Sequence, residues 1–129
     1  DFATLLSTAD FIMVMVPLTE KTKGLLGDAE FALMKPTARL INTARGKVVD
    51  TMALYNALKE GKFAAAALDV VDPEPLPGDH PLLTLPNITI TPHIGTSTVE
   101  TRDAMALLTA RNILAALEGK PMPAEVFEK

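Results

Sequence analysis

Three side chains suited to carboxylate binding and proton transfer lie in separate short motifs of this sequence. Arg45 lies in Asn-Thr-Ala-Arg-Gly, Glu74 lies between two prolines, and His93 lies in Thr-Pro-His-Ile-Gly. An arginine holds a carboxylate through two parallel hydrogen bonds, and an imidazole takes up or releases a proton near neutral pH. A carboxylate beside a histidine orients the ring and favours its charged form. The set predicts reduction of a carbonyl next to a carboxylate: Arg45 binds the acid and polarises the carbonyl, His93 protonates its oxygen as hydride arrives, and Glu74 aligns His93.

Each of these residues also has a simpler explanation when it is taken alone. Arginines are mostly exposed, so Arg45 fits a surface position, and Glu74 fits a solvated loop. His93 precedes an expected helix, where it fits a hydrogen-bonded position at the helix N-terminus. Asp69, at the end of an expected strand, either caps nearby backbone N–H groups or holds a polar part of a ligand. His80, in Gly-Asp-His-Pro, has no strand end beside it, and we interpret it as structural.

Alternating strand and helix patterns must position these side chains. The sequence predicts strands at residues 11–16, 39–43, 64–71 and 87–91, and helices at residues 2–9, 28–34, 51–60 and 97–118. The first strand is apolar at every position, which is typical of a strand buried on both faces of a parallel sheet.

Polar residues and glycines predict where the helices begin and end. Asp28 and Asp50 are expected N-caps, and Gly61 follows the helix that Asp50 begins. Ser97 and Glu100 have the spacing of a capping box, Ser-x-x-Glu, at the start of the last helix.

Strands that alternate with helices predict an α/β fold with a parallel sheet and right-handed crossovers. Ligands of such sheets bind beyond the carboxyl ends of the strands. Every candidate residue follows or closes one of the expected strands: Val16 and Pro17 the first, Thr43, Ala44 and Arg45 the second, Asp69 the third and His93 the fourth. This convergence is the physical argument for a site.

Composition excludes several other classes of function. The 129 residues suit one domain, and a net charge of −4 argues against a nucleic-acid surface. The absence of cysteine excludes disulfides and thiolate sites, and no apolar run approaches the roughly 18 residues that a membrane helix needs. Two histidines, His80 and His93, do not have the spacing of a zinc site. Because the sequence opens at Asp1 within a helical pattern, we expect it to be part of a longer chain.

Four segments together resemble the D-isomer-specific 2-hydroxyacid dehydrogenases. They are Val-Pro-Leu-Thr-Glu-Lys-Thr-Lys-Gly at 16–24, Ile-Asn-Thr-Ala-Arg-Gly-Lys-Val-Val-Asp at 41–50, Ala-Leu-Asp-Val-Val-Asp-Pro-Glu-Pro at 67–75 and Thr-Pro-His-Ile-Gly at 91–95. The resemblance covers nearly the whole chain, and residues 69–123 are most similar to the glyoxylate/hydroxypyruvate reductases of the family.

The resemblance implies a Rossmann-type, doubly wound parallel sheet that here lacks its first βαβ unit. Residues 1–129 would be the C-terminal part of the NAD(P)-binding domain. About residues 97–129 would be its terminal helix and a tail that returns toward the substrate domain. The Gly-x-Gly-x-x-Gly turn and the residues that contact the adenosine ribose are expected upstream, so the choice between NAD and NADP stays open, with NADPH favoured by the resemblance alone.

The resemblance also implies a role for each candidate residue. Arg45, Glu74 and His93 would be catalytic, and Arg45 and His93 would also contact the substrate. The cofactor would be bound by Val16, Pro17, Thr43, Ala44, Arg45, Asp69, His93 and Gly95. The implied partners are a small 2-keto or 2-hydroxy acid and a second copy of the protein in a homodimer. We expect no metal, nucleic acid or membrane partner, and a cytoplasmic location.

Three hypotheses follow. The protein reduces glyoxylate- or hydroxypyruvate-type 2-keto acids to D-2-hydroxy acids; or it is a phosphoglycerate-, lactate- or formate-type dehydrogenase of the same family; or it is a non-enzymatic NAD(H)-sensing module, like the transcriptional corepressors that resemble this family. A retained Arg–Glu–His set does not exclude the third.

Overall fold

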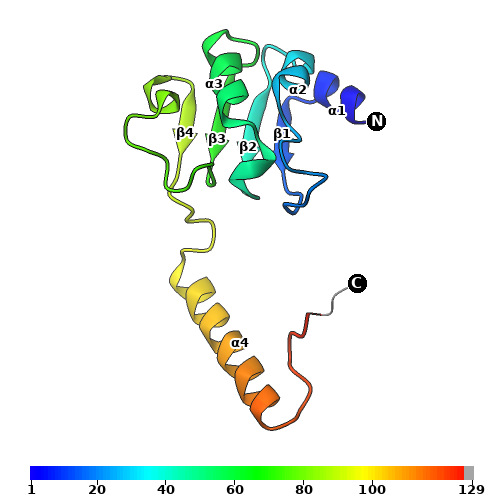
Figure 1. Ribbon diagram of the computed structural model, residues 1–129, viewed down its shortest axis with the longest axis vertical. Coiled ribbons are helices and arrows are strands. Elements are labelled where there is room, and N and C mark those ends of the chain that lie inside the picture. Colours follow the sequence, from blue (N-terminus) through cyan, green and yellow to red (C-terminus); the bar gives the residue numbers. More distant parts are fainter. Residues whose placement is uncertain (127–129) are drawn as a thin grey trace. The chain divides into compact units, whose positions relative to one another are not determined.

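Four parallel strands form one sheet whose spatial order, β1-β2-β3-β4, follows their order along the chain (Figure 1). The computed structural model describes residues 1–126. The strands are β1 (Phe11–Val14), β2 (Arg39–Asn42), β3 (Ala65–Leu68) and β4 (Ile88–Ile90). The helices are α1 (Phe2–Thr8), α2 (Asp28–Leu33), α3 (Thr51–Lys59) and α4 (Val99–Leu117), with 3-10 turns at Gly46–Val48 and Pro81–Thr84. The parallel α/β fold predicted from the sequence is therefore confirmed.

The register of the sheet brings the four strand ends level with one another. Asn42, the last residue of β2, pairs with Val14 of β1 and with Leu68 of β3, and Leu68 pairs with Ile90 of β4. The segments that follow these residues therefore leave the sheet along one edge, which is where ligands bind in parallel sheets.

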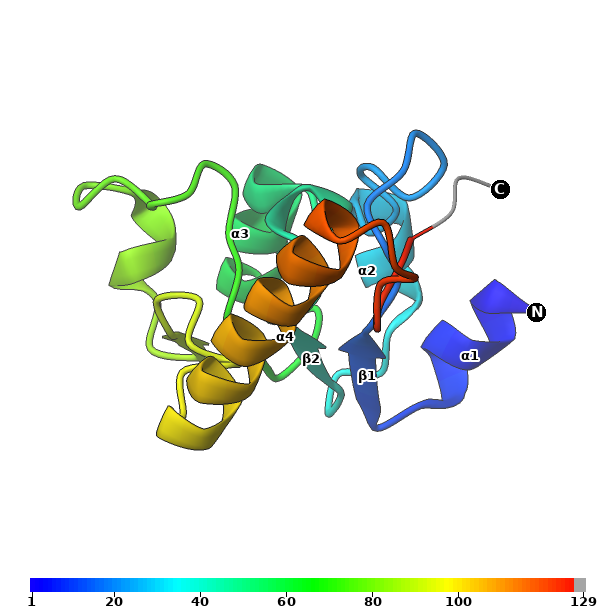
Figure 2. The ribbon, with the colours of Figure 1, turned by 90° about the horizontal axis from the view of Figure 1, so that it is seen from below.

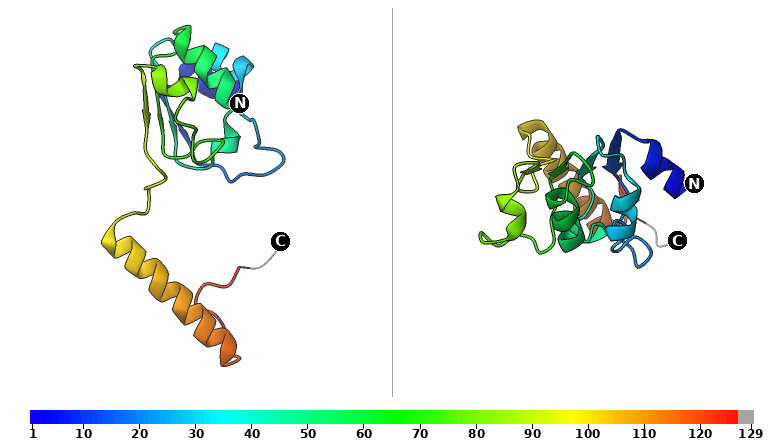
Figure 3. Two further views of the ribbon diagram at one scale, coloured as in Figure 1. Left: turned by 60° about the vertical axis from the view of Figure 1, so that its left-hand side comes forward. Right: turned by 90° about the horizontal axis from the view of Figure 1, so that it is seen from above.

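Helices α2 and α3 lie side by side on one face of the sheet, and α1 packs beside α2 (Figure 2 and Figure 3). Each strand is followed along the chain by its neighbour in the sheet, and crossovers between parallel strands are right-handed. Successive right-handed crossovers in one direction across the sheet place their helices on the same face. The core between helices and sheet includes Phe31 of α2 and Phe63, whose rings lie 5.5 Å apart, with Leu6, Leu40 and Leu54 fully or almost fully buried.

The expectation that the first strand is buried on both faces is wrong. Ile12 and Val14 are 6% exposed, but Phe11 is 63% exposed and Met13 is 58% exposed. The first pair faces the helices, and within residues 1–93 no helix covers the other face. A fully apolar run does not reveal which of its two faces a neighbouring layer covers.

The strands are also shorter than the sequence patterns predicted. Pairing of β1 ends at Val14, although the apolar run continues to Val16. At the end of β3, the N–H of Asp69 still donates to the carbonyl of Asn42 at 2.9 Å, and the chain then leaves the sheet.

The predicted cap at Asp50 is confirmed, and the one at Asp28 is shifted by one residue. Asp50 Oδ1 accepts the N–H groups of Met52 and Ala53 at 3.0 and 2.9 Å, and Gly61 follows α3 with a φ of 68°. Asp28 is the first residue of α2, which Gly27 caps; Glu30 accepts the N–H of Gly27 at 3.1 Å.

The second unit, which begins at Ile94, contains α4, and here the predicted Ser97–Glu100 capping box is wrong. Thr98 is the N-cap, and its hydroxyl accepts the N–H of Thr101 at 3.2 Å. Ser97 instead accepts a hydrogen bond from Arg102 at 2.9 Å. Adjacent hydroxyl residues have the same capping chemistry, so the sequence alone did not distinguish them. None of the helices within residues 1–126 is long and apolar enough to cross a membrane.

Candidate functional site

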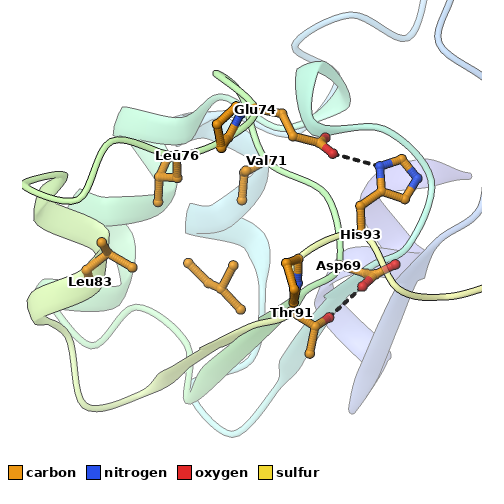
Figure 4. Close-up of a pocket in the computed structure, with 10 residues that line it drawn as sticks. Asp69, Val71, Glu74, Leu76, Leu83, Thr91 and His93 are labelled. Atoms are coloured by element: carbon orange, nitrogen blue, oxygen red, sulfur yellow. Dashed lines mark hydrogen bonds and ion pairs between the residues drawn. The ribbon is translucent and has the colours of Figure 1, made fainter. Parts of the chain in front are cut away.

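Glu74 and His93, which are 19 positions apart in the sequence, form a direct contact at the carboxyl edge of the sheet (Figure 4). His93 Nδ1 lies 2.7 Å from Glu74 Oε1, within the range of a charge-assisted hydrogen bond. The side chain of His93 is 51% exposed and that of Glu74 is 42% exposed, so about half of the imidazole ring is accessible to solvent. The structure thus brings together the carboxylate and the imidazole that the sequence predicted to act as a pair.

The backbone at His93 explains how the ring reaches Glu74. His93 has a φ of 54°, the left-handed conformation that residues other than glycine rarely adopt, and its N–H donates to the carbonyl of Thr91 at 3.0 Å. A tight turn therefore follows β4 directly. Such a conformation costs on the order of 1–3 kcal/mol and persists where surrounding contacts hold it, as is common at functional sites.

Asp69 lies beside this pair and is held by the strand that leads to His93. The hydroxyl of Thr91 donates to Asp69 Oδ1 at 2.6 Å, and the N–H of Thr91 donates to the carbonyl of Leu68 at 2.8 Å. Asp69 is only 8% exposed. Asp69, Glu74, Thr91 and His93 line one cavity of about 530 Å³, whose remaining wall is mostly apolar (Figure 4). Thr91 was not among the predicted site residues; its place just before Pro92-His93 was the available signal.

Arg45 lies on a loop that a buried amide holds in place. Asn42 is fully buried; its Nδ2 donates to the carbonyl of Arg45 at 3.0 Å, and its Oδ1 accepts the N–H of Ala44 at 3.0 Å. The guanidinium of Arg45 is exposed and donates to the carbonyl of Ala44 at 2.6 Å. Asn42 was also absent from the predicted site residues, although an asparagine at the end of a buried strand is a signal for such a turn.

A second cavity, of about 430 Å³, contains the other predicted residues of this edge. It is lined by Met15, Val16, Pro17, Leu18, Thr43, Ala44 and Arg45. The loop after Pro17 is closed by two threonines: Thr22 Oγ1 donates to the carbonyl of Pro17 at 2.6 Å and lies 2.8 Å from the backbone nitrogen of Thr19. Apolar surface with a few fixed polar groups is typical of a small-molecule site.

Gly46 allows the Arg45 loop to lie against the loop that carries Glu74. A Cβ at position 46 would lie 2.0 Å from the carbonyl oxygen of Val71 and 2.7 Å from the nitrogen of Asp72. Only a residue without a side chain permits this approach of two backbones. The arginine loop and the glutamate loop are therefore in direct contact.

The structure does not place all of the predicted residues around one cavity. Arg45 lines one cavity and the Glu74–His93 pair lines the other. Because Arg45 follows β2 and His93 follows β4, two strand spacings separate the strand ends, or about 10 Å.

The other candidate residues lie outside both cavities. Gly95 belongs to the second unit. His80 Nδ1 accepts the N–H of Leu82 at 3.2 Å and caps the 3-10 turn at Pro81–Thr84, in line with the structural interpretation. Among residues 1–126, no group of three or more His, Asp or Glu side chains is arranged to hold a metal ion.

Comparison with known proteins decides the family. Residues 1–95 match the D-isomer specific 2-hydroxyacid dehydrogenase, NAD binding domain. The chain belongs to this family. The sequence resemblance based on the four motifs is thereby confirmed, as is the Rossmann-type sheet.

Two relatives show how much of a family member the chain spans. It is 54% identical over 122 residues to the human glyoxylate reductase/hydroxypyruvate reductase, covering 95% of the chain and 37% of that protein. It is 52% identical over 126 residues to the glyoxylate reductase of Thermofilum pendens, covering 98% of the chain and 37% of that protein. The chain therefore spans little more than a third of the length of these relatives.

Solved structures of the family share the fold closely. The TT0316 protein of Thermus thermophilus superposes with a TM-score of 0.94 at 48% identity, over 98% of this chain and 40% of that chain. D-lactate dehydrogenase with NAD+ from Lactobacillus jensenii gives 0.90 at 35% identity, over 99% and 42%. A D-isomer specific 2-hydroxyacid dehydrogenase from Xanthobacter autotrophicus Py2, in complex with NADPH and MES, gives 0.82 at 36% identity, over 98% and 51%.

Proposed function

We propose that the protein containing this chain reduces small 2-keto acids of the glyoxylate and hydroxypyruvate type to D-2-hydroxy acids, using NAD(P)H. The observation that carries the proposal is the 2.7 Å contact between His93 Nδ1 and Glu74 Oε1 at the carboxyl edge of an NAD-binding sheet. Such a pair can hold an imidazole in one orientation, as donation of a proton to a carbonyl oxygen requires.

In this proposal Arg45 binds the substrate carboxylate. Its loop is fixed by Asn42, and its guanidinium is exposed at the same edge of the sheet. The separation of about 10 Å between the ends of β2 and β4 leaves room for a two- or three-carbon acid between guanidinium and imidazole. Arg45 would hold the acid by two hydrogen bonds and polarise the keto oxygen, while His93 delivers the proton to that oxygen.

The residues of the edge fit a nicotinamide cofactor. Asp69 presents a buried carboxylate held by Thr91, which suits an amide N–H, and Val16, Leu18 and Ala44 offer apolar surface for a flat ring. When bound, the cofactor supplies the hydride that the reduction needs. The residues we assign to its binding are Val16, Pro17, Thr43, Ala44, Arg45, Asp69, His93 and Gly95.

Several finer assignments depend on the similarity to longer relatives. We propose NADPH as the preferred cofactor, a cytoplasmic homodimer as the working form, and residues 1–129 as the C-terminal part of the NAD(P)-binding domain. Within it, about residues 97–129 would form the terminal helix and a tail that returns toward the substrate domain; the last three residues of this range lie outside the part of the chain that the structure describes. The matched relatives named as glyoxylate reductases support the substrate class.

Steady-state kinetics of the full-length protein test the proposal. Initial rates are measured with glyoxylate, hydroxypyruvate, pyruvate and 3-phosphohydroxypyruvate, each with NADPH and with NADH. We expect the highest kcat/KM with glyoxylate or hydroxypyruvate and NADPH. A preference for pyruvate would instead support a lactate-type dehydrogenase. This alternative is included because the chain shares its fold with D-lactate dehydrogenase. A His93→Ala sample purified in parallel controls for contaminating reductases, and parental rates no higher than that control would refute the proposed enzyme.

A further inference from the structure

The loop that carries Glu74 is attached to the first turn of α3 by a single side chain. The hydroxyl of Thr51 donates to the carbonyl oxygen of Asp72 at 2.8 Å, across 21 positions of the sequence. Asp72 is two residues before Glu74. Beside this bond, the backbone of Val71 and Asp72 crosses Gly46 at a distance that excludes a Cβ. The loop is therefore held at two adjacent points just before it reaches Glu74.

The hydroxyl of Thr51 is not needed to cap its own helix. Asp50 already caps α3, because its Oδ1 accepts the N–H groups of both Met52 and Ala53. Thr51 is the first residue of α3, and its side chain points its donor at another segment of the chain. A threonine that only favoured the helix would have no need of this long-range bond.

We propose that Thr51 is a positioning residue for the Glu74–His93 pair. Its hydroxyl fixes the carbonyl of Asp72, and this fixes the start of the segment from which Glu74 reaches His93. Glu74 and Asp69 are the titratable groups that line the cavity with His93, and Glu74 is the one in contact with the ring. If the bond to Asp72 is lost, the carboxylate of Glu74 moves away from Nδ1 and His93 loses its alignment. As far as it concerns catalysis, this inference rests on the proposed function.

The test replaces the hydroxyl and leaves the shape of the side chain. Thr51→Val removes the donor, Thr51→Ser keeps it, and Thr51→Ala is a second donor-free variant in case valine impairs folding. Thr8→Val is the matched control, since Thr8 Oγ1 also donates to a backbone carbonyl, that of Thr4, at 2.7 Å in α1. All variants are made in the full-length protein, alone and with Glu74→Gln.

The first readout does not need turnover. Proteins labelled with ¹⁵N at histidine are compared at one fixed pH, and the His93 ring signals are assigned by their loss in His93→Ala. We expect the Nδ1 signal in Thr51→Val and Thr51→Ala to move toward its position in Glu74→Gln, and Thr51→Ser to restore the parental position. Thr8→Val keeps the parental position. A His93 signal at the parental position in both donor-free variants would overturn the proposal, whatever the protein's substrate proves to be.

The second readout is catalytic. We expect loosening of the pair in Thr51→Val to lower kcat for 2-keto acid reduction by up to about fivefold, because an ion pair as exposed as Glu74–His93 contributes at most about 1 kcal/mol. In the Glu74→Gln background the same substitution should leave kcat almost unchanged, because Thr51 acts through Glu74. An undiminished loss in that background would show that Thr51 acts by another route and would overturn the proposal. Absence of reductase activity in the parental protein would refute the proposed function, while the His93 signal would still decide the role of Thr51.

Discussion

Replacement of Glu74 by glutamine tests whether this carboxylate aligns His93 for proton donation during reduction. Glutamine retains the size of the side chain and removes its charge. The 2.7 Å contact between Glu74 Oε1 and His93 Nδ1 fixes the orientation of the ring. In the proposed mechanism His93 gives a proton to the keto oxygen, and this transfer depends on the alignment of the ring. Glutamine offers only a neutral oxygen to Nδ1, so the ring is held less firmly and kcat for keto-acid reduction should fall.

Solvent exposure sets the size of this effect. The two side chains are 51% and 42% exposed, and ion pairs exposed to this extent contribute about 0.2–1 kcal/mol because water screens them. At about 1.36 kcal/mol for each factor of ten in rate, the upper value corresponds to a fall in kcat of about fivefold. A clearly larger fall would indicate that the full-length protein shields the pair from water.

The assay measures kcat and KM for keto-acid reduction at one fixed pH for the parent, Glu74→Gln and His93→Ala. His93→Ala should lower kcat by about 10²–10⁴-fold. Asp79→Asn, at an exposed carboxylate on the same loop, is the control and should keep the parental kcat. A parental kcat in Glu74→Gln would remove Glu74 from the mechanism, and a parental kcat in His93→Ala would identify another group as the acid.

Three further predictions follow from the same geometry. Arg45→Lys keeps the charge but loses the two-pronged hydrogen bond, and we expect kcat/KM to fall about a hundredfold; a value within twofold of the parent would contradict the assignment. Gly46→Ala places a Cβ 2.0 Å from the carbonyl oxygen of Val71, so urea unfolding should show a loss of about 1–3 kcal/mol together with reduced kcat. Gly78→Ala, where a Cβ meets nothing within 4 Å, should stay within about 0.5 kcal/mol, and equal effects at the two glycines would refute the argument. The 129-residue chain alone contains no Gly-x-Gly-x-x-Gly turn, so calorimetry should show no micromolar binding of NADPH, and detection of such binding would count against the expected upstream phosphate site.

Local sequence patterns predicted the elements because their causes are local. Alternation of strands and helices and the cap at Asp50 depend on residues within a few positions of one another, and the structure confirms them. The predictions that failed depended either on packing against distant segments or on a choice between two neighbouring residues with the same chemistry. The apolar run at 11–16 did not reveal that Phe11 and Met13 would be exposed, because that depends on which face the helices cover. Ser97 and Thr98 offered the same hydroxyl one residue apart, and the structure uses Thr98.

The candidate site was predictable in its reactive groups and not in the contacts that hold them. Arg45, Glu74 and His93 have side chains whose chemistry is visible in the sequence, and their positions after strands place them at one edge. Thr51 and Thr91 have ordinary polar side chains, and each bonds to a segment that only the fold brings close. Asn42 bonds to Ala44 and Arg45 within its own loop, so its position at a strand end was a local signal.

Gly46, which has no side chain, lies directly after Arg45 in the sequence, and the packing of two loops explains this arrangement. The loops after β2 and β3 leave adjacent strands with level ends, so both must occupy the same narrow edge. The two loops cross at Gly46, where a Cβ would lie 2.0 Å from the carbonyl oxygen of Val71, so the crossing leaves no room for a side chain. A residue without Cβ at the crossing lets the backbone of Val71 pass, and the arginine and the glutamate can then lie on either side of the contact. In the proposed mechanism the glycine thus allows the group assigned to carboxylate binding and the group assigned to orient the acid to reach one substrate, and a side chain at position 46 should disturb both together.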